Sequence, residues 1–118
     1  MAIQFEEDKV FIKDENIEWE QVDPKVKRKI MAYDKSLMMV KVAFETGGVG
    51  ALHSHFHTQI AHVESGVFEV EVEGIKHILK AGDAYYIPPN AVHGAVCLEA
   101  GVLIDMFSPM REDFIQAK

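Results

Sequence analysis

Histidine side chains gather in one short stretch of this chain. Four of its six histidines lie within residues 53–62, and His53, His55 and His57 alternate with other residues. Every second side chain of an extended strand points to the same face, so a regular strand would place these three rings and Gln59 together. Because a neutral imidazole offers a lone pair to a divalent cation, the spacing predicts a metal site that begins on one strand.

A third imidazole could reach this site from a neighbouring strand. His93 follows a Pro-Pro turn at 88–89, after which another strand is expected. Three imidazoles and the amide oxygen of Gln59 would leave coordination positions open for water or substrate, as in catalytic rather than structural sites. An exposed polar strand face is the alternative interpretation, and spacing alone does not separate the two.

A carboxylate lies among apolar residues near the C-terminus. Asp105 is flanked by apolar residues in the run 102–107 and would share one strand face with Leu103 and Phe107. A buried carboxylate needs a partner. A metal-lined interior would supply one, and loss of hydration would raise the pKa of Asp105 toward acid–base work. Arg111 carries a planar fork that matches a carboxylate. The alternatives are a solvated Asp105, an Arg111 paired with a neighbouring surface carboxylate, and a Phe107 that only packs in the core.

The elements that must position these residues are strands. Short β-like runs recur with turn signals about every eight to twelve residues and no helical pattern between them, which predicts an all-β sandwich or barrel. The expected strands are Lys9–Ile12, Lys25–Met31, Leu37–Phe44, Ala51–Glu64, Val67–Glu73, Ile75–Leu79, Ala84–Ile87, Val92–Leu98 and Val102–Phe107. Ser65 and Gly66 are expected to turn the chain, and only 109–116 has helical character.

Length and composition restrict the possible classes of protein. The 118 residues predict one domain, with an N-terminal arm over 1–24 and a β-barrel domain over 25–118. Cys97 is the one cysteine, so no intramolecular disulfide can form. A formal charge of −7 argues against nucleic acid and anionic membranes as partners. No apolar run is long enough to span a membrane, and the acidic start does not resemble a signal peptide, so we expect a cytoplasmic protein.

Two motifs resemble the paired motifs of the cupin family. The first, G-x5-H-x-H-x3–4-E-x6-G, aligns with Gly47, His53, His55, Gln59 and Gly66. The second, G-x5-P-x-G-x2-H-x3-N, aligns with Gly82, Pro88, Asn90, His93 and Cys97. The resemblance implies a single-domain jelly roll, or double-stranded β-helix, with a divalent metal inside. Three positions depart from the pattern: Gln59 replaces Glu, Asn90 replaces Gly and Cys97 replaces Asn. The neutral amide leaves the implied metal site one negative charge short.

Longer stretches resemble a narrower group. The segments 26–30, 50–60 and 102–114 are similar to the small cupins of pectin and alginate breakdown, which convert cyclic 4,5-unsaturated monouronates to linear ketonised forms. The resemblance implies that one divalent metal (Zn, Ni, Fe, Mn or Co) is held by His53, His55, Gln59 and His93. It also implies catalytic roles for Asp105 and Arg111 and substrate contacts from Phe107 and Arg111. The implied partners are a small-molecule sugar acid and a second copy in a homodimer.

Other function classes stay open at this point. One is a non-catalytic metal-containing cupin that binds sugar acids or senses them, and another is an oxygen-dependent metal cupin enzyme. His57 either supports the ligands or lies at the pocket mouth, whereas His62 and His77 are expected to take no part in the site. Because the chain is acidic, an anionic substrate requires a pocket that is locally positive.

Overall fold

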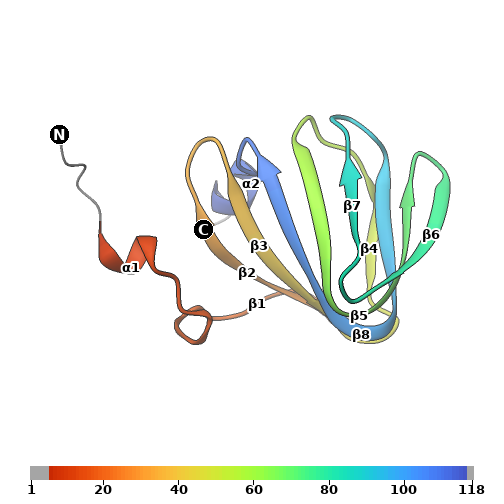
Figure 1. Ribbon diagram of the computed structural model, residues 1–118, viewed down its shortest axis with the longest axis horizontal. Coiled ribbons are helices and arrows are strands. Elements are labelled where there is room, and N and C mark those ends of the chain that lie inside the picture. Colours follow the sequence, from red (N-terminus) through yellow and green to blue (C-terminus); the bar gives the residue numbers. More distant parts are fainter. Residues whose placement is uncertain (1–5, 117–118) are drawn as a thin grey trace.

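One curved antiparallel sheet makes up most of the structure, a computed structural model that describes residues 6–116 (Figure 1). Its strands are β1 (Glu20–Asp23), β2 (Val26–Tyr33), β3 (Met38–Phe44), β4 (Val49–His53), β5 (Thr58–Val72), β6 (Ile75–Lys80), β7 (Ala84–Ile87) and β8 (His93–Ser108). The remaining elements are two short helices and a 3-10 turn: α1 (Glu7–Val10), α2 (Glu112–Gln116) and η1 (Asp14–Asn16). The all-β class and the jelly roll predicted from the sequence are confirmed.

The two longest strands, β5 and β8, belong to both halves of this sheet. They pair with each other along nearly their whole length, from Gln59 opposite Phe107 to Val72 opposite His93. The second half of β8 also pairs with β3, and its first half pairs with β4. Figure 1 shows both long strands bending at the bottom of the view, so that the two halves of the sheet face each other across an interior.

The bend of β5 lies where the sequence predicts a turn. Ser65 and Gly66 do not turn the chain, because β5 continues through them with shifts in its register against β8. Gly66 has a φ of +81°, and a Cβ on it would lie 2.5 Å from the carbonyl oxygen of Glu99. A glycine bulge bends a strand and keeps it paired, and its sequence signal resembles that of a turn. The ranges 92–98 and 102–107, which were expected to form two strands, belong to one strand, β8, because it too continues through the bend with shifts in its register against β5.

The N-terminal segment differs from its prediction as well. The strand expected over 9–12 is wrong: helix α1 covers the first two of these residues, the other two are in no regular element, and the segment's strand is β1, which pairs with β2. Asp14 lies 3.2 and 3.1 Å from the ammonium groups of Lys29 and Lys41, and these ion pairs fix the segment to the sheet. Residues 1–5 of the expected arm and the last two residues of the expected barrel domain lie outside the described residues.

Buried apolar side chains fill the interior in two clusters. The larger contains Phe68, Val63 and Leu103, and the smaller contains Met38, Val40 and Phe107. Phe114 of α2 packs on the smaller cluster, so the C-terminal helix covers that end of the interior. No helix within residues 6–116 is long and apolar enough to cross a membrane.

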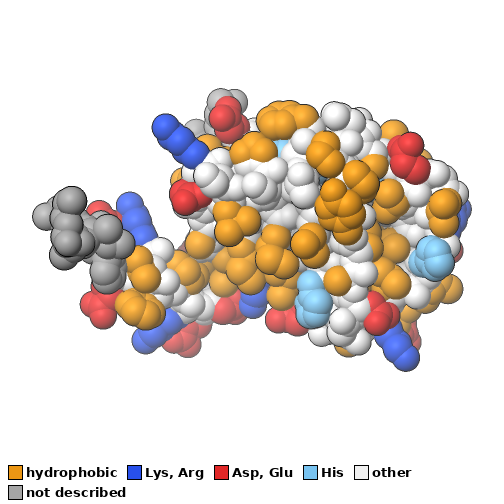
Figure 2. All heavy atoms as spheres, turned by 45° about the horizontal axis from the view of Figure 1, so that its top comes forward, with side chains coloured by type: hydrophobic (Ala, Val, Ile, Leu, Met, Phe, Trp, Pro, Cys, Tyr) orange, Lys and Arg blue, Asp and Glu red, His pale blue; other side chains and the backbone are white. Residues whose placement is uncertain are grey.

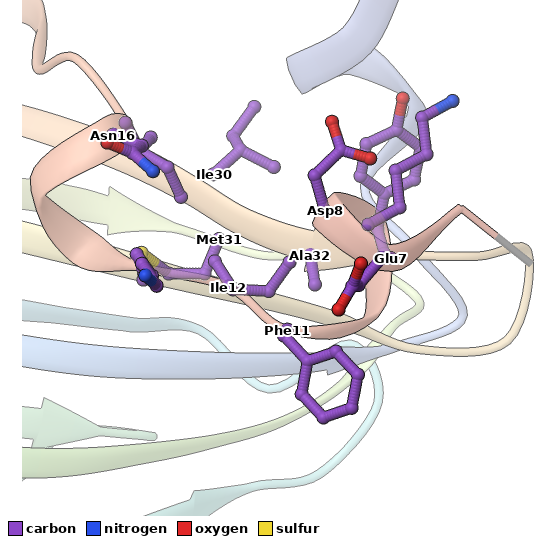
Figure 3. Close-up of a pocket in the computed structure, with 12 residues that line it drawn as sticks. Glu7, Asp8, Phe11, Ile12, Asn16, Ile30, Met31 and Ala32 are labelled. Carbon is purple, nitrogen blue, oxygen red and sulfur yellow. The ribbon is translucent and has the colours of Figure 1, made fainter.

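An open cleft of about 1010 Å³ separates the N-terminal segment from β2. Figure 3 shows Phe11 and Ile12 of the N-terminal segment and Ile30, Met31 and Ala32 of β2 among the side chains that line it. Its described lining includes carboxylates and lysines but no histidine or cysteine. The described lining of this cleft therefore offers no imidazole or thiolate ligand to a metal.

Candidate metal centre

The three histidines expected to bind a metal meet, but not on one strand. β4 ends at His53, β5 begins at Thr58, and His55 lies in the connection, so the expected regular strand over 51–64 is wrong. His93 opens β8 and pairs with His53 in the sheet. One ring nitrogen from each of the three lies within 4.8 Å of the others. Strand alternation holds only inside a regular strand, so it is strand pairing and a bent connection that bring these rings together.

Backbone carbonyls orient all three rings. The Nδ1 atoms of His53 and His93 lie 2.8 and 2.9 Å from the carbonyl oxygen two residues earlier in the chain. Nδ1 of His55 lies 3.2 Å from the carbonyl oxygen two residues later. A proton on Nδ1 donates to each carbonyl, which leaves the Nε2 lone pair free. This is the tautomer that metal-binding histidines use when Nε2 is the ligand.

Gln59 completes the set of donor atoms. Its buried side chain lies with Oε1 3.0 Å from Nε2 of His55, so an acceptor oxygen faces a ring nitrogen whose proton is on the far side. Nε2 of His93 is buried and has no hydrogen-bond partner among the described residues. Both arrangements suit a cation between these atoms. The residues therefore fit a divalent metal held by His53, His55, Gln59 and His93.

Burial favours the neutral form of two of these histidines, His55 and His93. Desolvation lowers the pKa of His93 to about 4 and lowers the pKa of His55, with smaller contributions from the nearby positive charges. A neutral imidazole can bind a metal, whereas a protonated one cannot. His55 and His93 therefore keep a lone pair available to a metal ion at lower pH than an ordinary histidine does.

Asp105 and Gln59 belong to neighbouring pairs of opposed residues on the same face of the sheet formed by β5 and β8. Phe107 is opposite Gln59 in the sheet, and Asp105 is opposite Ala61. The Gln59 amide N–H donates a hydrogen bond to Asp105, while Oδ1 of Asp105 is buried without a partner among the described residues. Desolvation raises the pKa of Asp105 to about 7, against opposing effects of Gln59 and Arg111. The carboxyl group can accordingly carry or release a proton near neutral pH.

The end of β8 and the segment after it bring Phe107 and Arg111 to the same place. The Phe107 ring lies 5.7 Å from the His55 ring, and the guanidinium carbon of Arg111 lies 5.3 Å from the Phe107 ring. Arg111 is also hydrogen-bonded to Asp113, the neighbouring-carboxylate contact that the sequence left as an alternative. The structure thus places every expected site residue around one cluster.

His57 and Tyr85 belong to the same surroundings, although sequence reasoning gave neither a definite role. His57 is 6% exposed, stacks on Phe56 at 4.0 Å, and forms a backbone hydrogen bond with Met110, while its Nδ1 has no partner among the described residues. Tyr85 is opposite Ala61, on the other side from Asp105. Alternation within Ala84–Ile87 was the signal that could have placed Tyr85 on the inner face.

Two histidines lie apart from the cluster, as expected. His62 is opposite Ile104 and Ala84. It is one residue along β5 from Ala61, the partner of Asp105, so it lies on the other face of the sheet. His77 is exposed on β6. Among the described residues, three buried side-chain polar atoms lack a hydrogen-bond partner: His57 Nδ1, His93 Nε2 and Asp105 Oδ1. All three belong to this one site. Unpaired buried polar atoms are costly, so their concentration here indicates a place that a metal and a polar ligand complete.

Several known proteins are similar to this chain in sequence and fold. The Cupin domain family model matches residues 40–107. The pectin degradation protein KdgF of Dickeya dadantii (strain 3937) is 52% identical over 107 residues, which cover 89% of this chain and 96% of that protein. Two solved structures are similar, both with a TM-score of 0.86. KdgF from Halomonas sp. is 45% identical, with 88% of this chain and 96% of that chain covered. An RmlC-like cupin from Shewanella frigidimarina NCIMB 400 is 43% identical, with 88% and 94% covered.

Proposed function

This chain belongs to the cupin family, and from that premise we propose that it is a metal-dependent enzyme that converts cyclic 4,5-unsaturated monouronates to linear ketonised forms. The observation that carries the proposal is the Gln59 amide, whose oxygen faces His55 and whose N–H donates to Asp105. It joins a metal-binding group to an acid–base group in one site. The 52% identity to a pectin degradation protein supports uronates as the substrate class, because pectin is a polymer of galacturonate.

The reaction is an isomerisation that needs only proton transfers. The hemiacetal hydroxyl at C1 loses its proton, the bond between C1 and the ring oxygen breaks, and an aldehyde and an enol result. The enol then loses its hydroxyl proton and gains a proton at C4, which gives the linear ketone. A bound divalent metal supplies Lewis-acid stabilisation of negative charge on substrate oxygens.

The chain's own residues have distinct tasks in this proposal. Asp105 accepts and returns the moving proton, for which a pKa of about 7 is suited. Arg111 binds the uronate carboxylate through its planar fork. Phe107 lies between the imidazoles and Arg111 and forms an apolar wall for the sugar. Because burial favours the neutral form of His55 and His93, the local positive charge that an anionic substrate needs comes from Arg111 and the metal.

A direct assay tests this function. We expect the metal-loaded protein to consume unsaturated galacturonate, followed as loss of its conjugated ultraviolet absorbance, and Asp105→Ala to be at least about 100-fold slower, since acid–base groups contribute that much. Equal rates for wild type, Asp105→Ala and buffer would contradict the proposal. Saturable binding without turnover would identify a binding or sensory protein instead, and oxygen uptake would identify an oxygen-dependent enzyme.

We also propose that the chain forms a homodimer through the outer face of its sheet. One row of residues crosses that face on five strands: Ala32, Met39, Met106, Ile60 and Tyr86, each opposite the next. Ile60 and Tyr86 are 45% and 57% exposed. Figure 2 shows that hydrophobic side chains are also exposed on the side of the molecule that it presents. A row without charge on a chain of net charge −7 is where a second, equally acidic copy can approach. The cytoplasmic location and the division into arm and barrel domain stay predictions.

A further inference from the structure

The guanidinium of Arg111 is held along one edge by Asp113. Nε lies 3.0 Å from Oδ1 of Asp113, and Nη2 lies 2.8 Å from Oδ2, so two parallel hydrogen bonds join the groups. The Arg111 side chain is 13% exposed and that of Asp113 is 61% exposed. The carboxylate therefore approaches from the solvent side, and the guanidinium lies beneath it.

Two aromatic rings hold the guanidinium from other directions. Its carbon lies 4.5 Å from the Phe114 ring centre and 5.3 Å from the Phe107 ring centre. Phe114 in turn contacts Phe107, at 5.8 Å, and the guanidinium of Arg28, at 4.0 Å. Consecutive residues of α2, Asp113 and Phe114, thus fix the edge and the face of Arg111. Few orientations of the fork are compatible with both contacts.

Part of the Arg111 guanidinium remains available to a ligand. A guanidinium has five N–H bonds, and Asp113 uses one on Nε and one on Nη2. The other edge, formed by Nη1 and Nη2, keeps the parallel geometry that binds a carboxylate through two hydrogen bonds. Phe107 connects this guanidinium to the interior, because its ring centre lies 5.3 Å from the guanidinium carbon and 5.7 Å from the His55 ring.

We propose, on the basis of the proposed function, that Asp113 is a positioning residue for uronate recognition. By holding the Nε edge of Arg111, it turns the Nη1–Nη2 edge toward the interior, where that edge binds the substrate carboxylate. Asp113 itself makes no contact with the substrate. It acts through Arg111, and its loss weakens substrate binding without removing a proton-transferring group.

Steady-state kinetics on unsaturated galacturonate tests this role. We expect Asp113→Asn to raise KM about five- to tenfold, the loss of a charge-assisted hydrogen bond, with kcat within about twofold of wild type. Glu112→Gln is the matched control, because it removes the same charge from the neighbouring exposed residue of α2, and its KM should equal that of wild type. Asp113→Asn added to Arg111→Lys should change KM no further, since a lysine has no fork to orient. An unchanged KM in Asp113→Asn, or equal effects of the two helix variants, would overturn the proposal. A lower KM would show that Asp113 competes with the substrate and would overturn it too.

A second readout does not depend on turnover. The Nε–H signal of Arg111 in ¹⁵N NMR spectra should be well dispersed in wild type and in Glu112→Gln, and averaged by rotation in Asp113→Asn. Saturated galacturonate, which has the same carboxylate, should shift that signal at lower concentration in wild type than in Asp113→Asn. Equal titrations would refute the positioning role. If wild type fails to consume unsaturated galacturonate, the proposed function fails, and these titrations still decide the role of Asp113.

Discussion

Gln59 shows how one amide can serve two neighbours. Its oxygen faces the His55 ring, and its N–H donates to Asp105. A glutamate, which the wider family pattern has at this position, could offer oxygen to a metal but no donor to Asp105. It would also put a second negative charge beside that carboxyl group and raise its pKa further. The departure from the family motif is thus explained by the residue next to it.

The buried Asp105 makes the stability of the metal-free protein depend on pH. Its pKa is about 7 in the folded chain, against an ordinary value of 3.8. Between these values the unfolded chain has lost the proton and the folded chain has not, so stability falls as pH rises toward 7 and then levels off. Asp105→Asn removes this dependence and should be more stable than wild type at pH 8, by up to about 4 kcal/mol, the equivalent of the pKa difference. Urea unfolding in a chelator checks it.

The comparison at low pH is the control for this prediction. Near pH 4 the folded carboxyl group is already protonated and resembles the amide, so the two proteins should have nearly equal unfolding free energies. Parallel stability curves from pH 4 to 8 would contradict the proposed titration of Asp105. A variant less stable than wild type at both pH values would indicate that the amide is not accommodated.

Much of the site could be anticipated at the residue scale. Motif spacing singled out His53, His55, Gln59 and His93, and the C-terminal pattern singled out Asp105. What spacing could not supply were the contacts that depend on packing from several elements. The hydrogen bond from Gln59 to Asp105 and the two aromatic contacts of Arg111 are of this kind.

Elements with regular alternation were predictable, whereas bent ones were not. β7 has the bounds expected from the sequence, and β3 differs from its prediction by one residue. β5 and β8 were each expected as two strands, because a bulge with glycine and a turn with glycine have the same local sequence signal. Only pairing with a distant strand distinguishes them, and pairing is not visible in a local pattern.

The bulge can be tested with a matched pair of glycines. Gly66 and Gly74 both have a φ of +81°, so alanine is strained at either position. A Cβ at Gly66 would also meet the backbone oxygens of Glu99 and Ala100 at 2.5 and 2.7 Å, whereas nothing lies within 4 Å at Gly74. We expect Gly74→Ala to lower the free energy of unfolding by about 1 kcal/mol and Gly66→Ala to lower it by at least about 3 kcal/mol. Chemical denaturation measures both, and equal losses would contradict the close packing of β5 on β8.

For the whole molecule, the outer face of the sheet predicts its state of association. Ile60 is the fourth of the five residues in the uncharged row and is 45% exposed, so a carboxylate there would be buried in a dimer but hydrated in a monomer. We expect wild type to sediment with about twice the chain mass of 13.3 kDa and Ile60→Glu to sediment as a monomer. Ile78→Glu, at a 65% exposed position on β6, is the control and should stay dimeric.

The centre should be independent of this association, because all of its residues come from one chain. Monomeric Ile60→Glu should therefore keep its metal content and its rate on unsaturated galacturonate, measured at a concentration where wild type is dimeric. A monomeric wild type, or an Ile60→Glu variant that stays dimeric, would remove this face as the dimer interface. A monomer that loses its metal would show that the partner copy stabilises the imidazole cluster.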